Sequence, residues 1–473
     1  MLWNYRPTVD PRPSERVPTA PRQVTRSPAG WLRSAGGLWS RVPVPWRAGA
    51  VCLALVAAGA GPWIEVAAAF LGRRTPFWIA EDFTAFYAAA KLIISGSGHR
   101  IFDISAIAAA ERAAAGHQVG GTGVLAYFNP PFFALAFAPL TVLSLEQAYQ
   151  VWTILSLGLL ALNGWLLWRI AAPLPRPWRT ALLVGYLTLY PVTFGLRLGQ
   201  FSLILQAAWG AGYLLLRQGR ERLAGFALAP LLIKPELLLP VAVFLAWKRR
   251  FRVFSTLVPL ALATAGISIA IVGIPAALAY PGYLMDSTTW NNGGVASNLM
   301  FNWMGILAAS GGDSLHHRVL AAAVLPLGTL AAAALLWRGE LRPGTRRFPV
   351  QWLALTLATV LADPHLYLQD TVLLVPAAAA VTAVMRGRQR LAAGVSLLFA
   401  WTVLRLALYP NQHLHVDLFA LSMAATLGAL VLAQMAAGRG SPVITPAHAR
   451  EPRGSAWARA SASPPATRPR TRA

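Results

Sequence analysis

Residues 253–272, VFSTLVPLALATAGISIAIV, decide the fold class because they run for 20 positions without a charged side chain. A helix of that length crosses the hydrocarbon core of a bilayer. Charged residues make up 12% of the chain, whereas a soluble domain carries about a quarter. We therefore expect an all-α polytopic membrane protein.

The apolar runs, each of roughly 17–25 residues, predict about twelve transmembrane helices. They begin near Ala48, Pro130, Ala148, Ala181, Phe201, Leu223, Val253, Val319, Val350, Thr371, Leu391 and Leu418. Residues 48–437 would then form one membrane domain. The flanking segments 1–47 and 438–473 are rich in Pro, Ser and Ala, so we expect disordered arms.

The net charge of +24 is concentrated partly in these arms. Residues 1–47 hold eight Arg against Asp10 and Glu15. Basic segments beside membrane spans fix topology and contact anionic lipid, which we favour over nucleic-acid binding. The single Cys52 excludes intrachain disulfides and cysteine-based metal sites.

Basic clusters at 248–252, 338–347 and 386–390 predict cytoplasmic turns by the positive-inside rule. Both termini are then cytoplasmic, and residues 72–128 form the first extracytoplasmic loop. Residues 361–370 face the same outer side as that loop.

Two topologies remain open between residues 129 and 247. If every run crosses once, the Arg clusters at 169–179 and 217–222 fall outside, against the positive-inside rule. Alternatively, residues 130–145 form a re-entrant or surface helix and the run 223–247 breaks at Lys234-Pro235. That arrangement moves both clusters inside.

The first outer loop shows helical patterning over residues 83–94 and 104–115, separated by the turn signal Ser95-Gly96-Ser97-Gly98. Two short helices lying along the membrane surface would fit this pattern. An ordinary amphipathic loop is the alternative.

Glu81-Asp82 opens this loop in a chain with only 17 acidic residues. A carboxylate at a membrane edge costs solvation energy, so its presence there suggests a functional role. Asp82 is our candidate for a general base that takes a proton from a hydroxyl. Its alternative role is a helix N-cap, and Glu81 is the substitute candidate.

A second polar cluster, DPHLYLQD, occupies residues 363–370. His365 could donate to a phosphate or steady a leaving group. The alternative is a loop histidine with Asp363 and Asp370 as helix caps. One His and two Asp at this spacing do not form a recognisable metal site, so no metal is expected.

Lys234 stands in an apolar run, where an ammonium is costly unless it is paired or faces a polar cavity. It could bind a phosphate or form an ion pair with Glu236 at a broken helix. Arg197 and Gln200 could line the same polar region, although Gln200 could also cap a turn.

Further candidates for substrate contact are Tyr87, within the outer loop, and Asn129, directly after it. The alternative for Asn129 is a structural role, because residues 127–131 form a rigid turn into a span. The sequence holds no Walker A loop, dinucleotide fingerprint or Gly-x-Ser-x-Gly elbow. We therefore expect no nucleotide cofactor and a donor dissolved in the membrane, such as a lipid-linked phosphosugar.

An ordered series of short motifs carries a family resemblance. It comprises Asp82-Phe83-x-x-Phe86-Tyr87, Gly96-x-Gly98, Ile101-Phe102-Asp103, Tyr127-x-x-Pro130-Pro131, Ala138-Pro139-Leu140 with Trp152, Gly199-Gln200, Ala224-Gly225 and Lys234-Pro235, ending in the basic cluster 248–252. The series resembles glycosyltransferase family 87 (DUF2029), integral-membrane C-type enzymes that use polyprenyl-phosphate mannose or similar donors. The chain departs from the family pattern at Phe102, often Tyr, and at Ser202, near an expected Asn.

The resemblance implies a C-type glycosyltransferase fold in the plasma membrane. It also implies inverting transfer of a sugar, commonly mannose or arabinofuranose, from a polyprenyl-phosphate donor to a lipid-linked or cell-envelope glycan. No metal or cofactor is implied. Asp82 matches the family's acidic residue and His365 its later histidine. A transporter or flippase of lipid-linked sugars is the alternative function, although we find no clear internal repeat.

Overall fold

The structure, a computed structural model, describes residues 42–72, 81–119, 123–285, 299–309, 319–384 and 412–439. The predicted arms, apart from residues 42–47 and 438–439, and the apolar run from Leu391 lie outside these residues. The long and medium helices are α2 (Val44–Phe70), α3 (Glu81–Ile94), α4 (Ile104–Ala115), α6 (Leu145–Ile170), α7 (Arg176–Leu187), α8 (Tyr190–Leu198), α9 (Ser202–Arg217), α11 (Pro235–Trp247), α12 (Phe251–Val272), α13 (Ile274–Met285), α17 (Leu325–Leu336), α18 (Arg347–Ala362), α19 (Leu374–Val384) and α21 (Gln412–Arg439). The shorter ones are α5 (Pro131–Leu135), α10 (Glu221–Leu228), α15 (Trp303–Ala309), η1 (Gly98–Arg100), η2 (Ala138–Val142), η3 (Ala229–Ile233), η5 (Leu320–Val324) and η6 (Leu368–Leu373).

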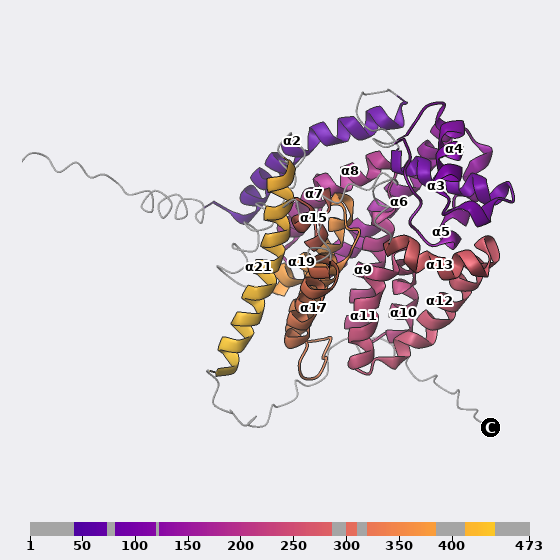
Figure 1. Ribbon diagram of the computed structural model, residues 1–473. Helices are drawn as coiled ribbons and strands as arrows, with labels where there is room; N and C mark the ends of the chain where they lie inside the picture. Colours follow the sequence, from indigo (N-terminus) through magenta and orange to yellow (C-terminus); the bar gives the residue numbers. More distant parts are fainter. Residues whose placement is uncertain are drawn as a thin grey trace, which may run out of the picture.

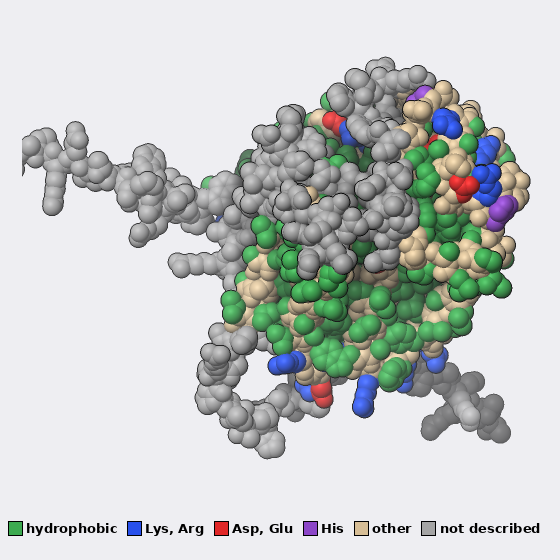
Figure 2. All heavy atoms as spheres, viewed as in Figure 1, with side chains coloured by type: hydrophobic (Ala, Val, Ile, Leu, Met, Phe, Trp, Pro, Cys, Tyr) green, Lys and Arg blue, Asp and Glu red, His purple; other side chains and the backbone are tan. Residues whose placement is uncertain are grey.

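Four of the described helical segments are long and apolar enough to cross a membrane: α2, α6, Arg176–Leu198 (α7 with α8) and α12. Their outer faces are apolar, as shown by Leu53 of α2 and Leu262 of α12, which are 73% and 69% exposed. Figure 2 shows a belt of hydrophobic side chains between basic side chains at the lower end and the polar α3–α4 region. An apolar outer surface of this kind needs lipid, so the chain is a membrane protein. The full set of about twelve crossings stays a prediction.

Basic turns from distant parts of the sequence gather at one end of the helix bundle (Figure 1). Arg169, Arg179 and Arg217 line one cavity there. Arg250 pairs with Glu221 at 2.9 Å, which brings the starts of α10 and α12 together. The topology that placed the clusters at 169–179 and 217–222 opposite residues 248–252 is therefore wrong.

The α10–η3–α11 segment is a hairpin that begins and ends at this basic end. It reverses at Lys234, because Pro235 has no N–H to continue the preceding turn and instead starts α11. Residues 130–145 contain only α5 and η2 before the Ser144 cap of α6, so they form no span. The second predicted topology is confirmed in both of these features.

Helices α3 and α4 match the predicted patterning of the outer loop. Asp103 caps α4 through the N–H groups of Ser105 and Ala106, and Gly116 ends it with φ 75°. Every residue from 83 to 90 of α3 is buried. Helix α3 is therefore packed inside an aromatic cluster, and its position along the membrane surface stays a prediction.

That cluster joins α3 to α5, α6 and α9. Phe86 stacks on Phe137 with ring centroids 5.3 Å apart, and Phe133 meets Phe201 edge-on at 4.8 Å. Aromatic pairs in these geometries add specific orientation to apolar burial. The cluster therefore fixes the N-terminal end of α3, where Asp82 lies.

Candidate active site

Lys234, at the reversal of the hairpin, is the centre of the buried polar network. Its Nζ lies 2.8 Å from Asp370 Oδ2, 3.0 Å from the His365 carbonyl oxygen and 3.3 Å from Asp363 Oδ2. An ammonium has three protons, and these three acceptors account for all of them. The predicted ion pair at a broken helix is present, but its partners are Asp363 and Asp370 rather than Glu236.

Ser202, the first residue of α9, extends this network toward α3. Its Oγ donates to Asp370 Oδ1 at 2.6 Å, so both Asp370 oxygens are occupied. Sequence reasoning noted Ser202 only as a departure from the family pattern. That departure marked a buried side chain that contacts the charged cluster.

Asp82 lies inside the first turn of α3, which begins at Glu81, so it is not the N-cap. Gln200 Nε2 donates to Asp82 Oδ2 at 2.7 Å. Burial raises the pKa of Asp82 to about 6; the Gln200 hydrogen bond lowers it and the charge of Asp370 raises it. A carboxyl group with this pKa is ionised at neutral pH and can still accept a proton readily.

The turn that carries Gln200 is held by two aromatic side chains of α6. Tyr149 donates to the Arg197 carbonyl at 2.9 Å, and Trp152 Nε1 donates to the Gly199 carbonyl at 2.8 Å. Gly199 has φ 71°, and a Cβ at this position would lie 2.6 Å from the Cβ of Phe83. Only glycine suits that conformation and that close approach. Gln200 is thus aimed at Asp82 by the backbone.

His365 lies beside Lys234, with its ring stacked on Phe128 at 5.5 Å between centroids. Its backbone N–H donates to Asp363 Oδ1 at 2.8 Å. Burial, and then the positive charge of Lys234, lowers the pKa of His365 to about 3. The imidazole is therefore neutral at physiological pH.

The remaining predicted residues make contacts that hold the framework. Asn129 donates to the Ile233 carbonyl at 3.2 Å, next to the hairpin reversal. Tyr87 donates to the Leu143 carbonyl at 2.8 Å, at the start of α6. Arg197 pairs with Glu65 of α2 at 2.6 Å rather than with the Lys234 network. The Glu81 side chain lies outside the described part of the structure.

The site thus joins five parts of the sequence: α3, the α8–α9 turn, the hairpin reversal, the 363–370 segment and the turn before α5. Among the described residues, no group of three or more His, Cys, Asp or Glu side chains has a metal-binding arrangement. A carboxyl group with a raised pKa beside a fixed amide and a charged network is a candidate acid–base centre.

Fold and site together define a polytopic membrane protein with a candidate acid–base centre within its helix bundle. The sequence model of glycosyltransferase family 87 matches residues 127–364, half of the chain, and the protein belongs to this family. It is therefore a membrane glycosyltransferase that uses a sugar donor and an acceptor. Searches of curated proteins and of solved structures found no match. The matched region contains Gln200, Lys234 and Asp363, whereas Asp82 precedes it.

Proposed function

We propose that the protein transfers a sugar, mannose in the first instance, from a polyprenyl-phosphate donor to a lipid-linked or cell-envelope glycan. The transfer takes place at the extracytoplasmic face of the plasma membrane and inverts the anomeric centre. The observation that carries this proposal is Asp82, held by Gln200 and given a pKa of about 6 at the edge of the Lys234 network.

In the proposed step, Asp82 accepts the proton of the acceptor hydroxyl. The hydroxyl oxygen forms a bond to the anomeric carbon as the bond from that carbon to the phosphate oxygen breaks. Polyprenyl phosphate leaves with the electron pair. Gln200 keeps the Asp82 carboxylate in place throughout, because its amide donates a hydrogen bond to Oδ2 and leaves Oδ1 to accept the proton.

Lys234 contributes to the departure of the phosphate through its positive field. Its three protons are already donated to protein oxygens, so it acts as a fixed charge rather than as a free hydrogen-bond donor. We assign His365, whose neutral imidazole belongs to the segment that contacts Lys234, as the hydrogen-bond donor to the leaving phosphate.

The direction of the site follows from the position of the basic turns. By the positive-inside rule we assign the end that carries Arg217 and Arg250 to the cytoplasmic side, and the sequence prediction puts both termini there as well. Lys234 is at the reversal of the hairpin, away from that end. This supports chemistry on the outer side, where a lipid-linked donor presents its sugar.

The test is a transfer assay with purified protein, radiolabelled polyprenyl-phosphate mannose and an acceptor lipid extract in detergent. Asp82→Asn should lower the rate by about 10²–10⁴-fold, the contribution of a general base. Asp103→Asn is the matched control and should retain activity, because Asp103 is a half-buried helix cap in the same loop. Near-normal transfer by Asp82→Asn would remove Asp82 from this role.

The same assay separates transfer from transport. Detergent micelles have no compartments, so a flippase would leave the donor unchanged, whereas a transferase releases polyprenyl phosphate and a heavier glycan. The mass gained by the product also identifies the sugar. A donor other than mannose would change the substrate without changing the role of Asp82.

A further inference from the structure

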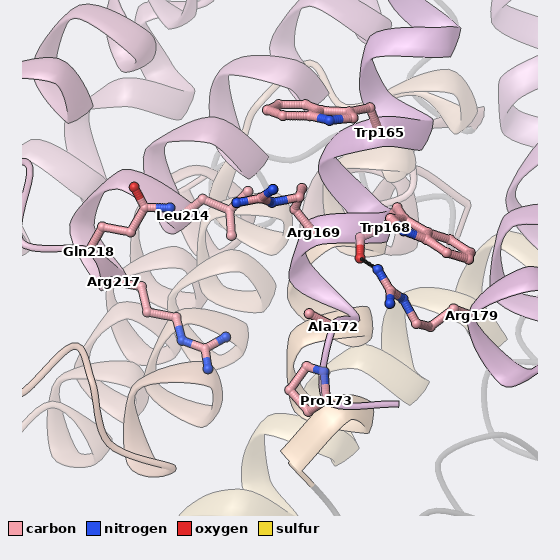
Figure 3. A pocket seen from close by; sticks show the side chains of 9 residues that line it. All are labelled: Trp165, Trp168, Arg169, Ala172, Pro173, Arg179, Leu214, Arg217 and Gln218. Carbon is pink, nitrogen blue, oxygen red and sulfur yellow. Dashed lines mark hydrogen bonds between the residues drawn. The ribbon is translucent and has the colours of Figure 1, made fainter. Parts of the chain in front are cut away.

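A cavity of about 700 Å³ opens at the basic end of the helix bundle, away from the candidate active site. It lies between the last turn of α6, the α6–α7 turn and the end of α9 (Figure 3). Its lining residues are Trp165, Trp168, Arg169, Ala172, Pro173, Arg179, Leu214, Arg217 and Gln218.

Three of these side chains are guanidinium groups, and no lining residue is acidic. In the described part of the chain, the ion pairs formed by Arg and Lys involve none of the three. Figure 3 shows Arg169 extending from α6 toward Leu214 of α9 and Gln218, the residue that follows α9. Uncompensated positive charge around one cavity favours an anionic occupant.

Arg179 is fixed in the wall of this cavity. Its Nη2 donates to the Trp168 carbonyl at 2.7 Å, and its guanidinium lies 3.8 Å from the centre of the Trp168 ring. Its buried Nε has no hydrogen-bond partner among the described residues. Guanidinium groups match phosphate oxygens in geometry and charge, and a fixed one loses little entropy on binding.

The cavity lies at the depth where two spanning segments meet water, because α6 ends and α7 begins there. Trp165, 56% exposed, lies at its rim, as expected for a tryptophan at a membrane interface. Leu162, Leu155 and Val151 continue the same exposed apolar stripe along α6 at helical spacing. A ligand with a phosphate head and hydrocarbon chains fits both parts.

We propose that this cavity binds the phosphate headgroup of an anionic phospholipid, with the acyl chains lying along the exposed stripe of α6. Basic pockets between transmembrane helices are recognised sites for such headgroups. The site is independent of the proposed sugar transfer.

The test counts lipids retained by purified protein in native mass spectrometry, with phosphatidylglycerol and phosphatidylcholine offered at equal concentration. We expect the wild type to retain phosphatidylglycerol in preference, in a saturable manner. Arg169→Gln with Arg217→Gln should weaken this retention about 30-fold, since each arginine contributes about 1 kcal/mol and 1.4 kcal/mol is about tenfold. The matched control is Arg222→Gln with Arg252→Gln, which removes equal charge from exposed positions outside the cavity.

Three outcomes would overturn the proposal. Equal weakening in both variant pairs would indicate a diffuse surface charge. Wild-type protein without preference for phosphatidylglycerol would exclude the site even if the variants fail to fold. Displacement of the lipid by low millimolar inorganic phosphate would assign the cavity to free phosphate rather than to a lipid.

Discussion

Asp82→Asn should make the folded protein more stable while it lowers the rate of transfer by about 10²–10⁴-fold. Burial holds the pKa of Asp82 at about 6 instead of its ordinary 3.8, so the native state disfavours the ionised carboxylate. At about 1.4 kcal/mol per pKa unit, the cost at neutral pH is at most about 3 kcal/mol. Asp82 is only partly buried, and screening reduces this to about 1–2 kcal/mol. Asparagine carries no charge and can still accept the hydrogen bond from Gln200.

The pH dependence of this gain follows from the sign of the shift. The cost is fully present above pH 6, where Asp82 is ionised in both the native and the unfolded state. As the pH falls from about 6 toward 4, the native carboxylate takes up its proton first, so the wild type gains stability relative to the variant. The difference in stability should therefore shrink toward zero near pH 4.

The measurement is unfolding by dodecyl sulfate in mixed micelles at pH 7.5 and pH 4.5, with wild type, Asp82→Asn and Asp103→Asn. Hydrogen bonds from Ser105 and Arg100 lower the pKa of Asp103 to about 2, so its substitution should lose stability at neutral pH. The two aspartates of one loop should thus respond with opposite signs. The reasoning would be refuted if Asp82→Asn were less stable than the wild type at pH 7.5. It would also be refuted if the difference in stability were the same at both pH values.

Four further results are expected. The transfer rate of the wild type should rise with pH up to about 6 and level off above it, as Asp82 loses its proton; a rate independent of pH would contradict this. Gln200→Leu should move this rise to higher pH, because the Gln200 hydrogen bond holds the pKa of the carboxyl down; the pH–rate profile measures it. Lys234→Met should destabilise the protein by about 3–5 kcal/mol in micelle unfolding, since two buried carboxylates lose their cation. Gly199→Ala should cost about 1–3 kcal/mol for its backbone conformation, whereas Gly158→Ala on α6 meets no atoms within 4 Å and should be tolerated.

The sequence predicted those features that depend on neighbouring residues. Helical patterning predicted the span 104–115 of α4, and the structure shows local signals at both of its ends, the Asp103 cap and Gly116. The reversal at Lys234 follows from Pro235. Prolines and basic clusters are local signals as well, so the sequence left only two possible topologies for residues 129–247.

Local signals did not predict ion pairs between residues that are far apart in the sequence. Lys234 is 129 residues from Asp363 and 136 from Asp370, whereas Glu236, the partner expected from sequence, is its neighbour. Arg197 was expected in the active site, yet it pairs with Glu65, 132 residues away. Helix patterning shows which face is apolar, but it does not show which polar groups of distant helices share that face.

Asp370 makes the two halves of the site depend on each other. One of its oxygens accepts from Ser202, which follows Gln200 in the α8–α9 turn, and the other accepts from Lys234. Its charge also raises the pKa of Asp82. The proton affinity of Asp82 is therefore linked to how well Lys234 neutralises Asp370. In the proposed transfer, the negative charge of the bound donor phosphate adds to that of Asp370 and raises the pKa of Asp82 further, so Asp82 becomes a stronger base as the donor binds.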